Sequence, residues 1–169
     1  MAMTGWLTGK SVRIEGDSPA IATALAAQGA TLVSDDDSDI WIHVTQPPGI
    51  TPAHELTFGA WRASLNAGLD RRFLGAKEFA DQCRVRGQGG VILYVGAPEQ
   101  TRGADHAAAA GALGNLTKTL GVEWARDGIR VNSILTHERG ETLGNLAAYL
   151  VSDYAAYVTG AVMGVGPDD

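Results

Sequence analysis

The stretch LTKTLGVEWARDGIRVNSI, residues 116–134, decides the fold of this 169-residue chain. Four large side chains recur there and just before it at helical spacing, which predicts a helix beginning near His106: Leu113, Leu116, Leu120 and Trp124. Gly128 is a usual helix stop, and IRVNSIL then reads as a strand. A helix that leads directly into an apolar strand is the repeating unit of an α/β fold.

The same alternation continues on both sides of this stretch. We expect further strands at 10–14, 30–33, 40–44, 91–95 and 159–165, and further helices at 19–28, 56–84 and 143–152. The strand at 40–44, IWIHV, is apolar enough to be buried on both faces. Strands that alternate with helices predict a doubly wound, mostly parallel sheet. No linker-like shift in composition divides residues 1–169, so we expect a single domain.

Charge and composition exclude several classes of function. The chain has 13 Lys and Arg against 19 Asp and Glu, a net charge of −6, and no basic stripe for nucleic acid. One small basic cluster is present, which we interpret as a solvated face rather than an anion site: Arg71, Arg72, Arg84 and Arg86.

Cellular setting and metal binding are constrained by a few residues. Cys83 is the only cysteine, and the opening MAMTGWLTGK lacks the apolar run of a signal peptide. No apolar segment is long enough to span a membrane, so we expect a cytoplasmic protein. His43, His54 and His137 are scattered without the spacing of metal ligands, so we expect no metal site.

Three segments together resemble the short-chain dehydrogenase/reductase family, of the type that includes 3-oxoacyl reductases and hydroxysteroid dehydrogenases. Residues 116–134 match the family's active-site helix and the strand after it, and 150–165, LVSDYAAYVTGAVMGV, match its closing helix and strand. WRASLN, residues 61–66, matches its central helix. The resemblance implies a Rossmann-like fold, and the chain resembles a truncated and degenerate member.

The resemblance implies a nicotinamide dinucleotide site, and the residues that would form it are degraded. Family members carry a glycine turn, which is EGDSPAIA here: Gly16 remains, while Ala20 and Ala22 stand in the other two glycine positions. Asp17 adds a negative charge where phosphates would lie, although Asp17 and Ser18 also suit a helix cap. Asp36 stands where the family holds the ribose, and equally suits a solvated turn. We therefore expect no cofactor in this chain, with NAD(P) in a catalytic partner.

Two longer parts of the family pattern are absent from the sequence. The strand at 40–44 follows the 30–33 strand almost at once, so an edge unit that forms much of the adenine pocket is missing. The family's Asn-Asn-Ala-Gly segment has become HVTQ at 43–46. Thr136 and His137 replace the Pro-Gly that opens the substrate lid, and the lid has shrunk to a short loop.

The family's catalytic set is also degraded. It consists of Asn, Ser, Tyr and Lys, and the matching positions here hold Asn66, Ala97, His106 and Ala110. An alanine can neither orient a carbonyl nor hold a ribose. His106 retains a titratable ring, for which a helix-terminal or interface role competes with general acid catalysis. We therefore expect no catalytic residues.

The segments that survive are those that form subunit interfaces in the family, namely the two long helices and the closing helix and strand. Gly111, Gly114 and Gly121 lower helix propensity, which close approach of another helix or packing on the chain's own sheet would explain. The central helix carries Trp61, Phe73 and Phe79. The sequence favours a non-catalytic subunit that pairs with an active short-chain dehydrogenase/reductase in a hetero-oligomer, or with itself as a homo-oligomer.

Two alternatives remain open at this stage. One is a minimal NAD(P)-dependent oxidoreductase with a site rebuilt from His106 and Asn66. The other is a small-molecule binding module, which predicts an apolar pocket near Asn66, Ala97 and His106 enclosed by one chain. The subunit hypothesis predicts instead a filled or open cleft and a large apolar interface.

Overall fold

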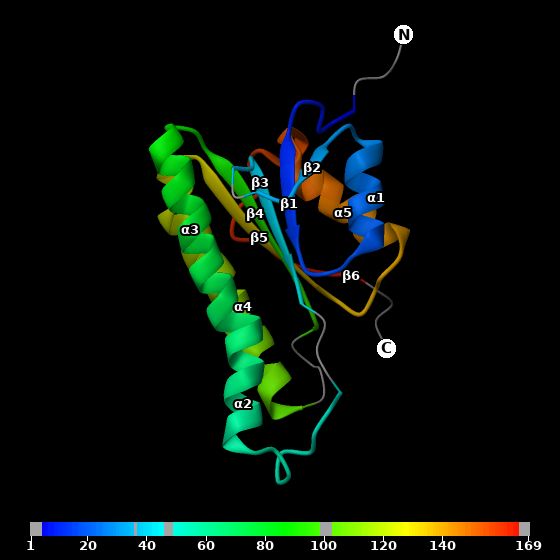
Figure 1. The fold of residues 1–169 in the computed structure, drawn as a ribbon, viewed down its shortest axis with the longest axis vertical. Coiled ribbons are helices and arrows are strands. Elements are labelled where there is room, and N and C mark those ends of the chain that lie inside the picture. The colour runs from blue at the N-terminus through cyan, green and yellow to red at the C-terminus, as the bar shows by residue number, and fades with distance from the viewer. Residues whose placement is uncertain (1–4, 36, 46–48, 99–102, 166–169) are drawn as a thin grey trace.

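The centre of the molecule is a six-stranded, entirely parallel sheet with the order β2-β1-β3-β4-β5-β6 (Figure 1). The computed structural model describes residues 5–35, 37–45, 49–98 and 103–165. Within them the strands are β1 Ser11–Glu15, β2 Thr31–Val33, β3 Ile40–Val44, β4 Gly90–Gly96, β5 Ile129–Thr136 and β6 Val162–Val165. The expected parallel α/β fold is confirmed.

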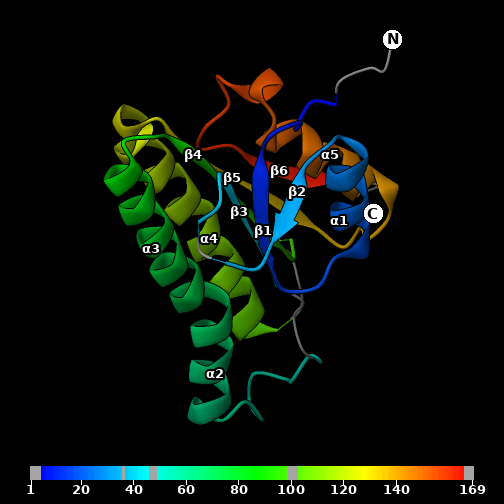
Figure 2. The ribbon, with the colours of Figure 1, turned by 45° about the horizontal axis from the view of Figure 1, so that its top comes forward.

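Helices cover both faces of the sheet (Figures 1 and 2). One face carries α1 Pro19–Ala27 and α5 Glu141–Val151. The other carries α4 Ala104–Glu123 and a long helix made of α2 Phe58–Leu65, the π-helical η1 Asn66–Asp70, and α3 Arg71–Arg86. Two short 3₁₀ turns, η2 Ala125–Asp127 and η3 Asp153–Ala155, follow α4 and α5.

The core divides into two clusters, one on each side of the sheet. The cluster under α1 and α5 is aliphatic and includes Ile21, Leu25, Ile42 and Leu143. The cluster under α3 and α4 is more aromatic, with Trp41, Phe79, Tyr94, Leu113 and Trp124. Strand β3 contributes to both clusters and is buried over its whole length, as its apolar sequence predicts.

Close contacts set the spacing of the helices on each face. A side chain at Gly144 of α5 would place its Cβ 2.5 Å from the carbonyl oxygen of Ala20 in α1. On the other face a Cβ at Gly75 of α3 would lie 2.4 Å from the Trp41 ring. Both glycines are therefore required by packing, because no real Cβ approaches another atom so closely.

The long helix differs from the single α-helix expected at 56–84. It begins at Phe58 and ends at Arg86, and its turn at Asn66–Asp70 is π-helical. A π turn accommodates one extra residue in a helix, and such turns are frequent at functional sites. It carries Gly68 to a buried position, where a Cβ would lie 3.7 Å from Ala109 of α4.

The missing edge unit is accommodated by the short β2. Val33, the last residue of β2, pairs beside Arg13, and Ile40, the first of β3, pairs beside Val12. One strand therefore ends almost level with the start of the next, and no helix lies between them among the described residues. The Asp39 carboxylate holds the segment between the two strands by accepting bonds of 2.8 Å and 2.9 Å from the backbone N–H and hydroxyl of Ser11.

Near the C-terminal end of the described chain, two boundaries differ from expectation. Helix α5 begins at Glu141, before the apolar run, and β6 begins only at Val162. Residues 159–161 connect to the sheet through turn contacts instead, including a 2.7 Å bond from the Gly160 N–H to Val131 O. No helix in the described part of the chain is long and apolar enough to cross a membrane.

Candidate ligand-binding site

A cavity of about 440 Å³ lies at the carboxyl edge of the sheet, bounded by α2 and η1 on one side and the start of α4 on the other. Much of its wall is made of small or apolar side chains, including Leu56, Ala60, Ala63, Ala67, Ala109 and Leu113. A few polar side chains also line it, among them Thr45, Ser64, Arg72, Asp105 and His106. Apolar walls with a few polar groups are typical of small-molecule sites.

Three of the four expected catalytic positions meet at this cavity. Ala97, His106 and Ala110 all line it, from the end of β4 and the first turns of α4. Asn66 is not among the lining residues. It is exposed on the long helix, where its side-chain oxygen accepts a 3.2 Å bond from Arg62. The π turn instead brings Gly68 to the cavity wall. The structure thus does not bring Asn66 and His106 together.

His106 is almost completely buried, with 7% of its surface exposed. Neither ring nitrogen has a hydrogen-bond partner, although Nε2 lies 3.5 Å from the carboxylate of the adjacent Asp105. That distance suits a weak ion pair if the ring is protonated, and it lacks hydrogen-bond geometry. His106 therefore has no group in place to orient its ring for proton transfer.

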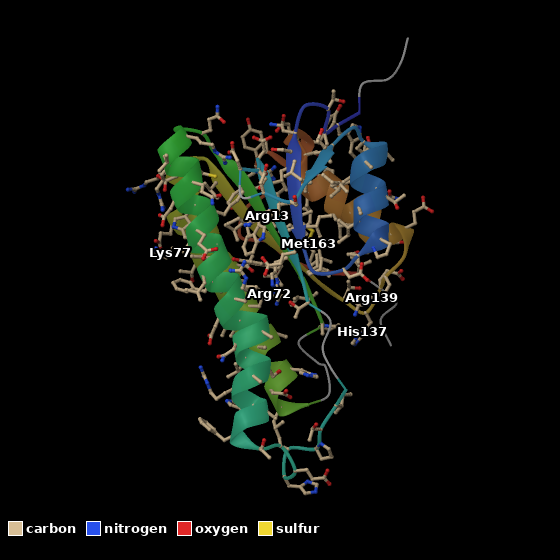
Figure 3. All side chains as sticks on the ribbon, in the orientation of Figure 1. Arg13, Arg72, Lys77, His137, Arg139 and Met163 are labelled. Atoms are coloured by element: carbon tan, nitrogen blue, oxygen red, sulfur yellow. The ribbon has the colours of Figure 1, made fainter. Side chains whose placement is uncertain are left out.

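Arg72 lies inside the protein rather than on a solvated face. Its side chain lies on the inner side of α3, whereas Lys77 points outward (Figure 3). It is 3% exposed, and its guanidinium donates from Nε to His43 Nδ1 at 3.2 Å and from Nη2 to Val95 O at 2.6 Å. The expectation of a solvated arginine face is wrong for this residue.

The other three arginines of that expected cluster do lie at the surface, each in an ion pair. Arg71 contacts Glu15 at 2.6 Å, Arg84 contacts Asp127 at 2.7 Å, and Arg86 contacts Asp37 at 2.5 Å. The positions of the four arginines along α3 explain why only Arg72 is buried. Arg72 lies one turn before Ala76 and two before Phe79, on the buried stripe of α3.

Burial controls the protonation of this polar group. Burial, followed by the nearby charge of Arg72, lowers the pKa of His43 to about 4, against an opposing effect of Glu15. His43 is therefore neutral at pH 7, which agrees with Nδ1 accepting a hydrogen bond from Arg72. Burial also lowers the pKa of Arg72 to about 10, so the guanidinium remains charged at pH 7.

The glycine turn lies at the same edge of the sheet, between β1 and α1. Gly16 has φ of +97°, and a Cβ there would lie 2.1 Å from Val44 O, so the fold itself requires this glycine. Ser18 is the N-cap of α1 but its side chain makes no capping bond, and Pro19 removes one backbone donor. Ser18 therefore occupies the expected cap position without forming a capping hydrogen bond.

The residues around this turn do not fit a nicotinamide dinucleotide. The hollow beside Gly16 has a volume of about 260 Å³ and includes Asp17, Pro19 and Ala22 in its lining. A carboxylate and a proline stand where a pyrophosphate needs backbone N–H donors. Ala110, in the cavity wall, offers no ammonium group to a ribose.

Two further expectations concern acidic residues and metal ligands. Asp36 lies outside the described residues, and its neighbour Asp37 is exposed and paired with Arg86. In the described ranges no group of three or more His, Cys, Asp and Glu side chains is arranged to hold a metal ion.

Sequence comparison finds dehydrogenases and reductases. The chain is 26% identical to 3beta-hydroxysteroid dehydrogenase 1 from Eggerthella lenta, across 79% of this chain and 64% of that protein. It is 28% identical to cis-4-hydroxycyclohexanecarboxylate dehydrogenase from Sinomonas cyclohexanicum, across 68% of this chain and 58% of the relative. The chain thus spans about three fifths of the length of these curated relatives. No protein-family profile matches it.

Solved structures agree with the fold. A short-chain dehydrogenase/reductase from Serratia marcescens superposes with a TM-score of 0.81 at 20% identity, across 95% of this chain and 97% of that one. The sheet order, the helix layers and these sequence relatives carry the same conclusion. The chain has the fold of the short-chain dehydrogenases/reductases, and its sequence is similar to that of dehydrogenases over about three fifths of their length.

Proposed function

We propose that this chain is a non-catalytic, dehydrogenase-like subunit that packs onto an active short-chain dehydrogenase/reductase through its long helices. The single observation that carries the proposal is the exposure of helix α2. None of its eight residues is buried, and Phe58 at its start is 78% exposed. Figure 1 shows α2 extending beyond the carboxyl edge of the sheet. A helix with no fully buried residue gains less from packing within its own chain than α3 or α4 does.

The same layer exposes further apolar side chains. Phe73 and Leu74 are exposed on α3, and Val122 is 77% exposed on α4. Figures 1 and 2 show α3 and α4 side by side on one face of the sheet, so their outer surfaces can meet one partner. Apolar side chains gathered on one face favour a protein interface.

The glycines of α4 support a contact between this helix and a partner only in part. A Cβ at Gly111 would meet nothing within 4 Å, so this position is open to an approaching helix. Gly121 instead packs against the chain's own Gly160, whose backbone nitrogen would lie 2.5 Å from a Cβ there. Gly114 is buried. One glycine of the three is therefore available for contact with a partner.

The proposal assigns all redox chemistry to the partner. Alanine at positions 97 and 110 removes hydroxyl and ammonium groups from the cavity, and the glycine turn does not fit the dinucleotide. In this arrangement the partner holds NAD(P), and the present chain stabilises it or shapes its substrate pocket.

Co-expression with active short-chain dehydrogenases encoded near this gene, followed by sizing and mass analysis, tests the proposal. We expect a mixed oligomer with one of them. Phe58→Lys should abolish co-purification, while Leu32→Lys, at an apolar site on β2 that is 44% exposed, should leave it intact. A chain that is a stable monomer and never co-purifies would contradict the proposal, and a homodimer would replace the hetero-oligomer.

A second candidate function is ligand binding without chemistry. The cavity of about 440 Å³ favours it, because it lies near Ala97 and His106 and is lined by residues of this chain. A rebuilt oxidoreductase site is less supported, since Asn66 does not line that cavity and is bonded to Arg62 instead. Calorimetric titration with NADH and NADPH distinguishes the ligand-binding function from the rebuilt oxidoreductase, because micromolar binding of either nucleotide would favour the oxidoreductase.

A further inference from the structure

The charge of Arg72 has no carboxylate partner among the described residues. Both protein acceptors of its guanidinium are neutral, the imidazole of His43 and the carbonyl oxygen of Val95. Its remaining contact is with the Tyr94 ring, whose centroid lies 5.7 Å from the guanidinium carbon. An unpaired buried charge is costly, so a buried guanidinium is normally matched by an anion.

The open part of this guanidinium faces the cavity. Arg72 lines the cavity together with Gly96, and a Cβ at Gly96 would lie 3.3 Å from Nη1 and 3.2 Å from Nη2. Nη1 makes no hydrogen bond to the described protein, yet it is not among the buried atoms that lack a partner. It is therefore reachable from the cavity and has donors to spare.

Other charged groups limit which ligand fits. Asp105, at the start of α4, also lines the cavity and lies beside His106, whose ring has no hydrogen bond. Among the described residues Asp105 makes an ion-pair contact with His106 and none with Arg72. The acid sits at a helix N-terminus, where the helix dipole stabilises it.

From this arrangement we propose that the cavity binds a small monocarboxylate with an apolar body. The carboxylate receives hydrogen bonds from Arg72, and the body contacts the alanine and leucine side chains of α2, η1 and α4. This inference deepens the second candidate function and is independent of docking on a partner.

Calorimetric titration of the full chain with benzoate and hexanoate tests the inference, with benzamide and hexanamide as uncharged matches. A charge-assisted hydrogen bond predicts that each amide binds at least about tenfold more weakly than its acid. Acetate has the charge without the body, and we expect it to bind about tenfold more weakly than hexanoate.

Arg72→Met removes the charge at similar volume, and we expect acid binding to fall at least about tenfold. The matched control is Arg71→Met, which breaks the surface pair with Glu15 but leaves the cavity, and should change binding less than about twofold. In Arg72→Met, His43 Nδ1 and Val95 O lose their donor, so a cooperative thermal unfolding transition above the titration temperature is required to show that the variant is folded.

Three results would each overturn the inference. They are equal binding of acid and amide, unchanged binding by folded Arg72→Met, and no binding of either acid at about 10 mM. None of them bears on co-purification of the Phe58 and Leu32 variants, so failure of this inference and failure of the docking proposal are distinguishable.

Discussion

The two helical layers of the sheet differ in how completely they are used by the chain itself. Helices α1 and α5 lie over the sheet, and a Cβ at Gly144 of α5 would come within 2.5 Å of α1. The layer of α2, η1, α3 and α4 extends past the sheet, leaves Phe58 exposed and forms one wall of an open cavity. The difference indicates that the first layer holds the fold and the second has surface available for other molecules.

The sharpest way to test this comparison is to overpack the first layer. Gly144→Ala places a methyl group against Ala20 O and 3.0 Å from Ala24 Cβ, both on a helix that cannot move without disturbing the sheet. We expect a loss of about 3 kcal/mol or more in the free energy of unfolding, measured by urea denaturation. A loss below about 1 kcal/mol would mean that the α1 and α5 layer is looser than its geometry indicates.

The second layer is stabilised partly by the hydrogen bond between Arg72 and His43, and the titration of His43 makes the free energy of unfolding depend on pH. His43 faces Glu15, 3.8 Å away, as well as Arg72 and the more distant Arg71. Its pKa is lowered from 6.5 to about 4 in the folded state, so the unfolded state binds the proton first. Stability is full above pH 6.5 and should fall by about 3 kcal/mol as the pH drops to 4.

Urea midpoints across this pH range measure the effect. His43→Asn keeps an acceptor for Arg72 without a titrating ring, so its midpoint should vary less with pH than that of wild type. Equal slopes in the two proteins would show that His43 is not the group responsible.

A smaller effect is expected on the outer face of the second layer. Gly111→Ala adds a methyl group to a helix where nothing lies within 4 Å. The free energy of unfolding should rise by about 0.5 to 1 kcal/mol, because alanine favours the helix. The same variant should weaken co-purification if a partner helix approaches this glycine. One added methyl group would then raise the stability of the isolated chain and lower its binding to the partner.

The smallest expected effect is at Phe58. Because this side chain is 78% exposed, Phe58→Lys should change the free energy of unfolding of the isolated chain by less than about 0.5 kcal/mol. A larger loss in thermal or urea unfolding would mean that Phe58 packs within its own chain, and any loss of co-purification would then have to be ascribed to misfolding.

The alternation of elements could be predicted from sequence because apolar periodicity records which side of each element is buried. Strand β3 and helix α4 are examples, although α4 ends at Glu123, before the predicted stop, and a 3₁₀ turn separates it from Gly128. The π turn at Asn66–Asp70 could not be predicted, because one extra residue leaves both flanking helical patterns intact. Asn66 was consequently assigned to a site that it does not reach.

The cavity was predicted only in part. The positions of Ala97, His106 and Ala110 follow from matching the chain to a family, and they do meet. The burial of Arg72 was not predicted, because the four arginines were treated as one charged cluster. The position of Arg72 on the buried stripe of α3 was not considered. Its two neutral acceptors come from β3 and β4, which are distant in sequence. Such contacts depend on strand order, which local patterns do not encode.

The brevity of β2 also affects how copies of this protein behave in solution. The outer strand β2 of the sheet has three residues. An edge strand this short offers few unpaired backbone groups to a strand from another molecule, which protects this edge against fibre formation. Concentrated solutions should therefore assemble through side chains, if they assemble at all, rather than by extending the sheet at this edge.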